Sequence, residues 1–293
     1  MTGDQRLTLA AGSARCIAYP QFGGSLGAWT VAGQNMLRGA QISEDATFDP
    51  LRMSSFPLVP YSNRIGNAQY DWDGTTINLT RNFAPEPHAI HGVGWTRHWD
   101  ITCQQANSVT LSYAHIADDS WPWDFLAEQT FDLTNEALTL KLRARNDHSS
   151  AVPLAFGHHP YFDAAGATLR FSADTVWMSG MDALPTTHVP ASGDYDFAAG
   201  VKVADRVLDH CFTGWNGTAR IDWADRAYAL ELTATPTLGV AVVYIPKAGD
   251  AFCFEPVPHI NNALNRRDQT PSMPIIAPGA WFGAEIVMRA VTA

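Results

Sequence analysis

Hydrophobic and polar residues alternate with a period of two along much of the chain. The clearest run covers residues 138–145, where leucines occupy one face and mostly polar residues occupy the other. Residues 6–9 and 77–80 alternate in the same way. Because successive side chains of a strand point to opposite faces of a sheet, each run predicts a half-buried β-strand.

Turn-forming residues separate these runs, and helical periodicity is scarce. Residues 70–77 predict a hairpin around the dipeptide Asp73-Gly74, which suits a tight β-turn. Short helical turns are expected only at residues 33–37 and 263–267.

Composition and length are those of a globular protein with an ample core. The chain has 293 residues, of which 46% are hydrophobic and 16% are charged. Many short strands without long helices predict sheets packed on sheets, so the expected fold class is all-β, a large antiparallel β-sandwich. No internal repeat or linker interrupts the sequence, which predicts a single domain over residues 1–293.

The charge balance limits the classes of expected binding partner, and the N-terminus and the cysteines bear on the cellular location. The chain carries 19 Lys and Arg residues against 29 Asp and Glu residues without a basic run, so neither nucleic acid nor a membrane surface is an expected partner. The N-terminal residues lack the features of a signal peptide, which predicts a cytoplasmic location. The four cysteines show no Cys-x-x-Cys spacing, so we expect reduced and mostly buried thiols.

Residues 156–162 place two histidines between a glycine and a proline, with aromatic residues on both sides. Histidine has the side-chain pKa nearest neutrality, so His158 and His159 are candidate proton donors or acceptors. Pro160 disfavours helical backbone in the residue before it and therefore holds His159 extended. The alternative is a buried strand end with one hydrogen-bonded histidine.

Two polar clusters lie earlier in the chain. Asn63 and Arg64 stand among apolar residues, where an arginine can donate several fixed hydrogen bonds to ligand oxygens or form a structural ion pair. His88 and His91 are three residues apart, which is one possible metal-ligand spacing. We predict no metal there, because the accompanying glutamate of a His-Glu-x-x-His motif is missing and nearby prolines disfavour a helix.

The last clusters contain carboxylates. In an extended strand Cys253 and Glu255 face the side opposite to their phenylalanine neighbours. Burial raises the pKa of such a carboxylate towards useful general-base strength, although pairing with an arginine such as Arg64 is the alternative. Asp209 and His210 form a weaker signal that suits either hydroxyl binding or a turn.

Taken together, these clusters resemble the aldose 1-epimerase (galactose mutarotase) family, with five short motifs in the family's order. The motifs are Asn63-Arg64-Ile65, His91-Gly92 with Trp99, His159-Pro160-Tyr161-Phe162, Asp209-His210 with Phe212, and Glu255-Pro256.

The resemblance implies a two-sheet super-sandwich that binds a free sugar in an open cleft without metal or cofactor. It implies that His159 is the general acid and Glu255 the general base, with His158 as the competing candidate for the acid. The implied sugar-binding residues are Asn63, Arg64, His91 and Asp209. The pair Gly157-His158 differs from many galactose-specific members, so the preferred aldose stays open. The sequence does not give the oligomeric state.

Three other functions compete with mutarotation. A sugar-binding or sugar-sensing protein would keep the cleft and need neither acid nor base. A glycoside hydrolase would normally need two carboxylates at one bond, and the sequence offers one carboxylate and one histidine. A sugar-phosphate epimerase would favour an Arg and Lys cluster, and only Arg64, Arg81 and Arg97 lie near the motifs.

Overall fold

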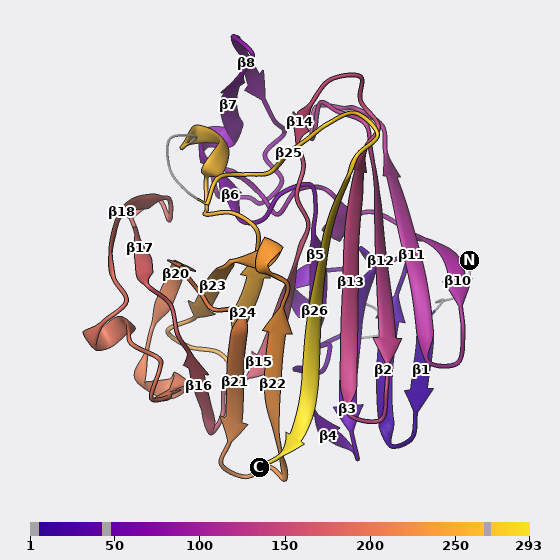
Figure 1. Ribbon diagram of the computed structural model, residues 1–293, viewed down its shortest axis with the longest axis vertical. Helices are drawn as coiled ribbons and strands as arrows, with labels where there is room; N and C mark the ends of the chain where they lie inside the picture. Colours follow the sequence, from indigo (N-terminus) through magenta and orange to yellow (C-terminus); the bar gives the residue numbers. More distant parts are fainter. Residues whose placement is uncertain (1–5, 43–47, 267–270) are drawn as a thin grey trace.

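The computed structural model describes residues 6–42, 48–266 and 271–293, and its regular secondary structure is mostly β-strand. Two large antiparallel sheets pack face to face (Figure 1), which confirms the expected all-β sandwich. In hydrogen-bonding order the eleven-stranded sheet contains β1 (Leu7–Ala11), β2 (Ala14–Tyr19), β3 (Ser25–Val31), β5 (Ser55–Leu58), β15 (Gly157–Asp163), β24 (Ala251–Val257), β23 (Val240–Ile245), β20 (Leu208–Thr213), β17 (Thr175–Ser179) and β18 (Pro185–Pro190), with β4 (Gln34–Asn35) paired to β3.

The nine-stranded sheet supplies the other layer. In order it contains β10 (Asp100–Gln104), β11 (Ser108–His115), β12 (Phe125–Leu133), β13 (Ala137–Asn146), β26 (Trp281–Thr292), β22 (Tyr228–Ala234), β21 (Thr218–Trp223), β16 (Ala167–Phe171) and β19 (Val201–Lys202). Three small pairs complete the described strands: β6 (Arg64–Ile65) with β9 (Ala89–Ile90), β7 (Gln69–Trp72) with β8 (Thr75–Asn78), and β14 (Val152–Pro153) with β25 (Ile275–Ile276).

Helical structure in the described ranges is limited to three-residue 3₁₀ turns. These are η1 (Pro50–Arg52), η2 (Gly66–Ala68), η3 (Gly94–Thr96), η4 (Gly193–Tyr195), η5 (Val203–Asp205), η6 (Pro236–Leu238) and η7 (Ala263–Asn265). None of them is long and apolar enough to cross a membrane.

Strand β13 shows how the alternating sequence builds the core. Leu138, Leu140 and Leu142 are buried between the sheets, while Lys141 and Arg143 on the opposite face are exposed. The strand lies between β12 and β26, with Leu140 opposite residues of both neighbours. The predicted strand over residues 138–145 is therefore confirmed.

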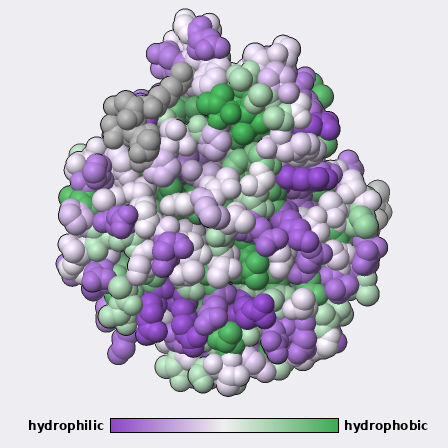
Figure 2. Space-filling view, viewed as in Figure 1, coloured by the Kyte–Doolittle hydropathy of each residue, from purple (hydrophilic) through white to green (hydrophobic). Residues whose placement is uncertain are grey.

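The outer face of the nine-stranded sheet is polar. Ion pairs link neighbouring strands there, including Lys141 with Asp132 at 2.7 Å and Arg220 with Glu231 at 2.9 Å. Figure 2 shows the side of the molecule on which this sheet faces the viewer, a mixture of hydrophilic and neutral residues with scattered hydrophobic ones. The candidate site lies on the outer face of the other sheet.

Two local predictions have different outcomes. The hairpin at Asp73-Gly74 is confirmed, because both residues adopt positive φ, 46° and 77°, between β7 and β8. The prediction of a helical turn at residues 33–37 is wrong. Ala32 and Gly33 also have positive φ there, so the chain reverses and β4 pairs with β3 instead of coiling.

Two further predictions, the helical turn at residues 263–267 and the reduced, mostly buried thiols, agree with the described residues. η7 lies within residues 263–267, of which residue 267 is outside the described residues. All four thiols are free, and three of them are buried, whereas Cys103 is exposed.

We expect Leu140→Ala to lower the free energy of unfolding by about 2–5 kcal/mol, since it leaves a cavity between the sheets. Lys141→Ala, one residue along and on the solvent face, removes only a surface ion pair worth at most about 1 kcal/mol. Urea denaturation of both variants measures the difference. Equal losses would contradict the assignment of the two faces.

Candidate active site

The candidate residues gather where four neighbouring strands of the eleven-stranded sheet present one face. Tyr161 on β15 lies opposite Cys253 on β24, which lies opposite Tyr244 on β23, and Tyr244 in turn lies opposite Asp209 on β20. Residues in register share a face of the sheet, and Glu255, two residues beyond Cys253, shares it as well. Four strands of the sheet thus contribute to one surface.

Strand β15 lies between β5 and β24. Its pairing with β24 covers Tyr161–Asp163, and its pairing with β5, on the other edge, covers Gly157–Pro160. Extending the β24 register by two residues places His159 opposite Glu255. The His159 Nε2 atom lies 3.3 Å from the Glu255 Oε1 atom.

The pair is buried and incompletely hydrogen-bonded. His159 is 6% exposed and Glu255 is 1% exposed. The second imidazole nitrogen, Nδ1 of His159, and the second carboxyl oxygen, Oε2 of Glu255, have no hydrogen-bond partner among the described residues. Buried polar atoms are almost always satisfied, so these two atoms mark a place where a polar ligand would supply partners.

Burial shifts the pKa values of both groups in the direction that favours their neutral forms. Loss of solvation raises the pKa of the Glu255 carboxyl well above its ordinary range, and the nearby Asp209 carboxylate raises it further. Loss of solvation also lowers the pKa of His159 to about 3. The displaced values make the Glu255 carboxylate a stronger base and the His159 imidazolium a stronger acid than the free side chains.

Aromatic rings fix the imidazole of His159. Its ring stacks on Phe56 with centroids 4.5 Å apart, lies 4.8 Å from the ring of Tyr161, and meets His91 edge-on at 5.2 Å. His91 and Gly92 both have positive φ, and a Cβ on Gly92 would lie 2.2 Å from the carbonyl oxygen of Val59. Glycine is therefore required at this turn.

Asn63 and His91 hold each other in place. The backbone amide of His91 donates to the Asn63 carbonyl oxygen at 2.9 Å, and the Asn63 amide donates to His91 Nδ1 at 3.3 Å. The Asn63 side-chain oxygen accepts from the Arg64 amide at 2.9 Å. These bonds tie the residue before β6 to the residue after β9 at the end of this strand pair.

Arg64 is held by two carboxylates. Its guanidinium donates twice to Glu86, through Nε at 2.9 Å and through one terminal nitrogen at 2.8 Å, and its other terminal nitrogen lies 3.4 Å from Asp209. The ion-pair alternative for Arg64 is therefore present, but with Glu86 and Asp209 and not with Glu255. The hydrogen bonds from Arg64 hold the pKa of the Glu86 carboxyl below its ordinary value.

These groups line a cavity of about 270 Å³. All six predicted residues line it, namely Asn63, Arg64, His91, His159, Asp209 and Glu255. Sequence reasoning assigned no role to three further lining residues, Glu86, Tyr161 and Tyr244. The one local signal for Glu86 is its place between Pro85 and Pro87, because a residue before proline is held extended.

His158 points the other way, into the sandwich. It is fully buried, its Nδ1 contacts the Ser55 hydroxyl, and its Nε2 lies 3.2 Å from the side-chain oxygen of Gln129 on β12. Gln129 in turn donates to the carbonyl oxygen of Gly24 at 2.8 Å. His159 thus contacts Glu255 on the outer face of the sheet, whereas His158 hydrogen-bonds across the interior to the other sheet.

The structure also bears on metal binding. Both ring nitrogens of His88 have backbone partners, the Asn67 amide and the Asp182 carbonyl oxygen, each at 2.9 Å, so His88 does not face a shared site with His91. Among the described residues, the group that could hold an ion is His159, Cys253 and Glu255, whose ligand atoms lie within 4.8 Å of one another. A nitrogen, a sulfur and an oxygen donor form a set that zinc accepts.

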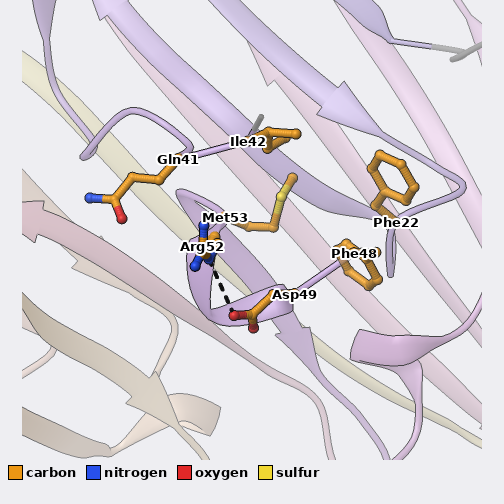
Figure 3. A pocket seen from close by; sticks show the side chains of 7 residues that line it. All are labelled: Phe22, Gln41, Ile42, Phe48, Asp49, Arg52 and Met53. Atoms are coloured by element: carbon orange, nitrogen blue, oxygen red, sulfur yellow. Dashed lines mark ion pairs between the residues drawn. The ribbon is translucent and has the colours of Figure 1, made fainter. Parts of the chain in front are cut away.

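A separate small pocket is lined by Phe22, Phe48 and the ion-paired residues Asp49 and Arg52 (Figure 3). Its volume is about 20 Å³, which is room for about one water molecule. It does not compete with the cavity of His159 as a sugar site.

The sequence model of the aldose 1-epimerase family matches residues 5–289, and the chain belongs to this family. YphB, an uncharacterized protein of Escherichia coli K12, is 28% identical over 247 residues, which cover 80% of this chain and 83% of YphB. The aldose 1-epimerase of Haemophilus influenzae is 29% identical over 177 residues, which cover 52% of this chain and 51% of that protein. A crystal structure from Escherichia coli K12 aligns with a TM-score of 0.91 and 26% identity, covering 99% of this chain and 100% of that one.

Stability should fall as the pH falls from about 6.5 towards 4. Burial lowers the pKa of His158 to about 3 and that of His259 to about 4, so both imidazoles stay neutral in the folded chain while their unfolded counterparts bind protons below pH 6.5. The stability present above pH 6.5 is therefore lost on acidification, by up to about 1.4 kcal/mol per pH unit for each imidazole.

His158→Gln removes one of these protonation sites and should flatten the dependence of the unfolding free energy on pH. His98→Ala, which removes an exposed imidazole, is the matched control and should leave the dependence unchanged. Denaturant titrations between pH 4 and pH 7 measure both slopes. An unchanged slope in His158→Gln would show that this imidazole is not buried in neutral form.

Proposed function

We propose that the protein is an aldose 1-epimerase that interconverts the α and β anomers of a free aldose. The observation that carries the proposal is the buried contact of His159 with Glu255 in a cavity where each group keeps one unpartnered polar atom. Family membership agrees with this reaction class. The H. influenzae relative, named an aldose 1-epimerase, adds support.

In the proposed reaction the Glu255 carboxylate takes the proton of the anomeric hydroxyl on C1. His159, as imidazolium, gives its proton to the ring oxygen, the bond between C1 and that oxygen breaks, and an open-chain aldehyde forms. Rotation about C1–C2 presents the other face of the carbonyl, and the ring closes with both proton transfers reversed. Each positioned group contributes about 10²–10⁴-fold.

Burial of the two side chains favours the ring-opening step. Before the step the pair is a carboxylate and an imidazolium, and afterwards it is a carboxylic acid and a neutral imidazole. Burial favours the second form of both groups. The pair holds one proton in either state, so no proton has to be exchanged with solvent between turnovers.

The remaining cavity residues suit a neutral polyol. Asp209 accepts hydrogen bonds from hydroxyl groups, and the Arg64 guanidinium, oriented by Glu86, donates to sugar oxygens. Glu86, Asp209 and Glu255 place three carboxyl groups in the cavity against one arginine, which is already paired. This balance favours a free sugar over a sugar phosphate.

We predict that Glu255→Gln and His159→Ala each slow mutarotation by about 10²–10⁴-fold while the fold is kept. Polarimetry of freshly dissolved α-glucose and α-galactose measures the rate, and circular dichroism measures the fold. His158→Gln is the control and should keep most of the activity, since His158 lies outside the cavity. Loss of activity in His158→Gln alone would transfer the acid role to His158, and a near wild-type rate in Glu255→Gln would remove the base role from Glu255.

Arg64→Ala should raise KM and lower kcat together, because the guanidinium both binds and orients the sugar. Glu86→Gln should give a smaller defect of the same kind, since Arg64 keeps its contact with Asp209 but loses one charged partner. Initial mutarotation rates over a range of sugar concentrations separate the two constants. If Glu86→Gln were as severe as Arg64→Ala, Glu86 would be expected to contact the sugar itself.

A further inference from the structure

Three side chains of the kinds that bind zinc meet at one place beside the catalytic cavity. They are His159 on β15 and Cys253 and Glu255 on β24, and all three are buried. One ligand atom from each lies within 4.8 Å of the others. Cys253 shares the face of Glu255, because residues two apart in a strand point to the same side. The proposed reaction uses the histidine and the glutamate and assigns nothing to this thiol.

The spacing of the catalytic pair is that of two ligands on one zinc ion. Zinc holds imidazole nitrogen at about 2.0–2.1 Å and carboxylate oxygen at about 2.0–2.2 Å, so two such ligands in a tetrahedron lie about 3.3–3.5 Å apart. The His159 Nε2 and Glu255 Oε1 atoms are 3.3 Å apart. A sulfur ligand at about 2.3 Å from zinc lies about 3.6 Å from the other donors, so Cys253 Sγ needs to move by about 1 Å.

Unpartnered polar atoms at the same place are a second observation that points to a ligand. The Oε2 atom of Glu255 has no hydrogen-bond partner among the described residues, although this residue is only 1% exposed. The same holds for Nδ1 of His159, which is 6% exposed. Buried polar atoms are almost always satisfied. Carboxylates bind cations through one or both oxygens, so a cation held by Glu255 would satisfy Oε2.

The charges around the three side chains favour a cation. Glu86 and Asp209 line the same cavity as Glu255, and Arg64 is the one arginine among the described residues that line it. Arg64 already pairs with both of these carboxylates, at 2.8 Å and 3.4 Å. A divalent cation beside Glu255 therefore adds positive charge where carboxyl groups are in excess.

We propose that Zn²⁺ binds to His159, Cys253 and Glu255 and that the bound ion inhibits the protein reversibly. The inhibition rests on the proposed mutarotase function, whereas the binding does not. Binding displaces two protons per ion, one from the Cys253 thiol and one from the pair of His159 with Glu255, and the freed lone pairs coordinate the zinc. The pair then has no proton for the ring oxygen and no free carboxylate for the anomeric hydroxyl. The ion therefore competes with the sugar and is not a cofactor of the reaction.

Mutarotation of α-glucose and α-galactose in metal-free buffer with added zinc chloride tests the inhibition. We expect half-inhibition at about 1–10 μM free Zn²⁺, a lower affinity than that of structural sites with four protein ligands. KM should rise while kcat stays unchanged, because the ion and the sugar exclude each other. Addition of EDTA should restore the rate. An unchanged KM over this range of zinc concentrations would overturn the inhibition.

Cobalt gives a readout that does not depend on activity. Zinc has a filled d shell and no visible absorption, whereas Co²⁺ in a tetrahedral site absorbs visible light. Thiolate ligation of Co²⁺ adds a charge-transfer band in the near ultraviolet. We expect this band when Co²⁺ is titrated into the wild-type protein without oxygen, and we expect Zn²⁺ to abolish it. Absence of the band would overturn the assignment of Cys253 as a ligand.

Cys253→Ala removes the sulfur ligand. It should raise the zinc concentration for half-inhibition by at least about 10–100-fold, since the loss of an outer-shell partner alone costs this much. Cys16→Ala, which removes an equally buried thiol on β2, is the matched control, and Cys103→Ala removes the exposed thiol. Both should keep the zinc sensitivity and the cobalt band. Equal zinc sensitivity of Cys253→Ala and the wild-type protein would overturn the proposal, and so would its loss in Cys103→Ala.

The remaining outcomes separate this inference from the proposed function. If no sugar were accelerated, the mutarotase function would fail, and equilibrium dialysis of zinc would still decide the site. A bound ion that is lost in Cys253→Ala would support the site, and equal binding would exclude it. Inhibition by Mg²⁺ or Ca²⁺ at the same concentrations would overturn the sulfur and nitrogen ligands, because these ions prefer oxygen. Circular dichroism measures the fold of each variant, and Cys253→Ser replaces Cys253→Ala where the alanine variant does not fold.

Discussion

The buried contact of His159 with Glu255 determines what the surrounding structure has to provide. Buried against each other, an imidazole and a carboxyl group are stabilised as a hydrogen-bonded pair that shares a proton, because an isolated charge there would be costly. The sheet provides the pair by placing β15 beside β24, with His159 in line with Glu255 on one face.

Rigidity around the pair has two physical sources. Phe56, Tyr161 and His91 enclose the imidazole ring of His159 with aromatic surface, which limits its rotation. On the sugar side, two carboxylates hold the Arg64 guanidinium, whose planar shape suits bidentate pairing. Preorganisation of this kind means that a bound sugar does not have to order the site.

Much of this arrangement follows from local sequence. The period of two fixes which face a residue occupies, and it explains why the adjacent His158 and His159 have different surroundings. Prolines after His159 and Glu255 indicate extended backbone at both. The order of the motifs supplied the pairing of His159 with Glu255, which lie on neighbouring strands although about a hundred residues separate them in sequence.

Other features depend on contacts that no local pattern encodes. Glu86 is a loop residue whose role comes from meeting Arg64 across 22 positions, and a carboxylate in a loop is by itself uninformative. The choice between His158 and His159 required knowing which face of β15 meets β12. At residues 33–37 the positive φ of Ala32 outweighed the helical propensity of the residues that follow.

Charge is the property of the site that most constrains its ligand. Each carboxyl group in the cavity already has a partner, Arg64 for both Glu86 and Asp209 and the His159 imidazole for Glu255. A ligand that carried a negative charge would have to break one of these pairs or lie unpaired beside them, and both are costly next to buried carboxyl groups. A neutral polyol avoids both costs, because its hydroxyl groups donate to carboxylates and accept from the guanidinium without displacing either. The same pairing that holds the catalytic groups in place therefore also selects the charge of the substrate.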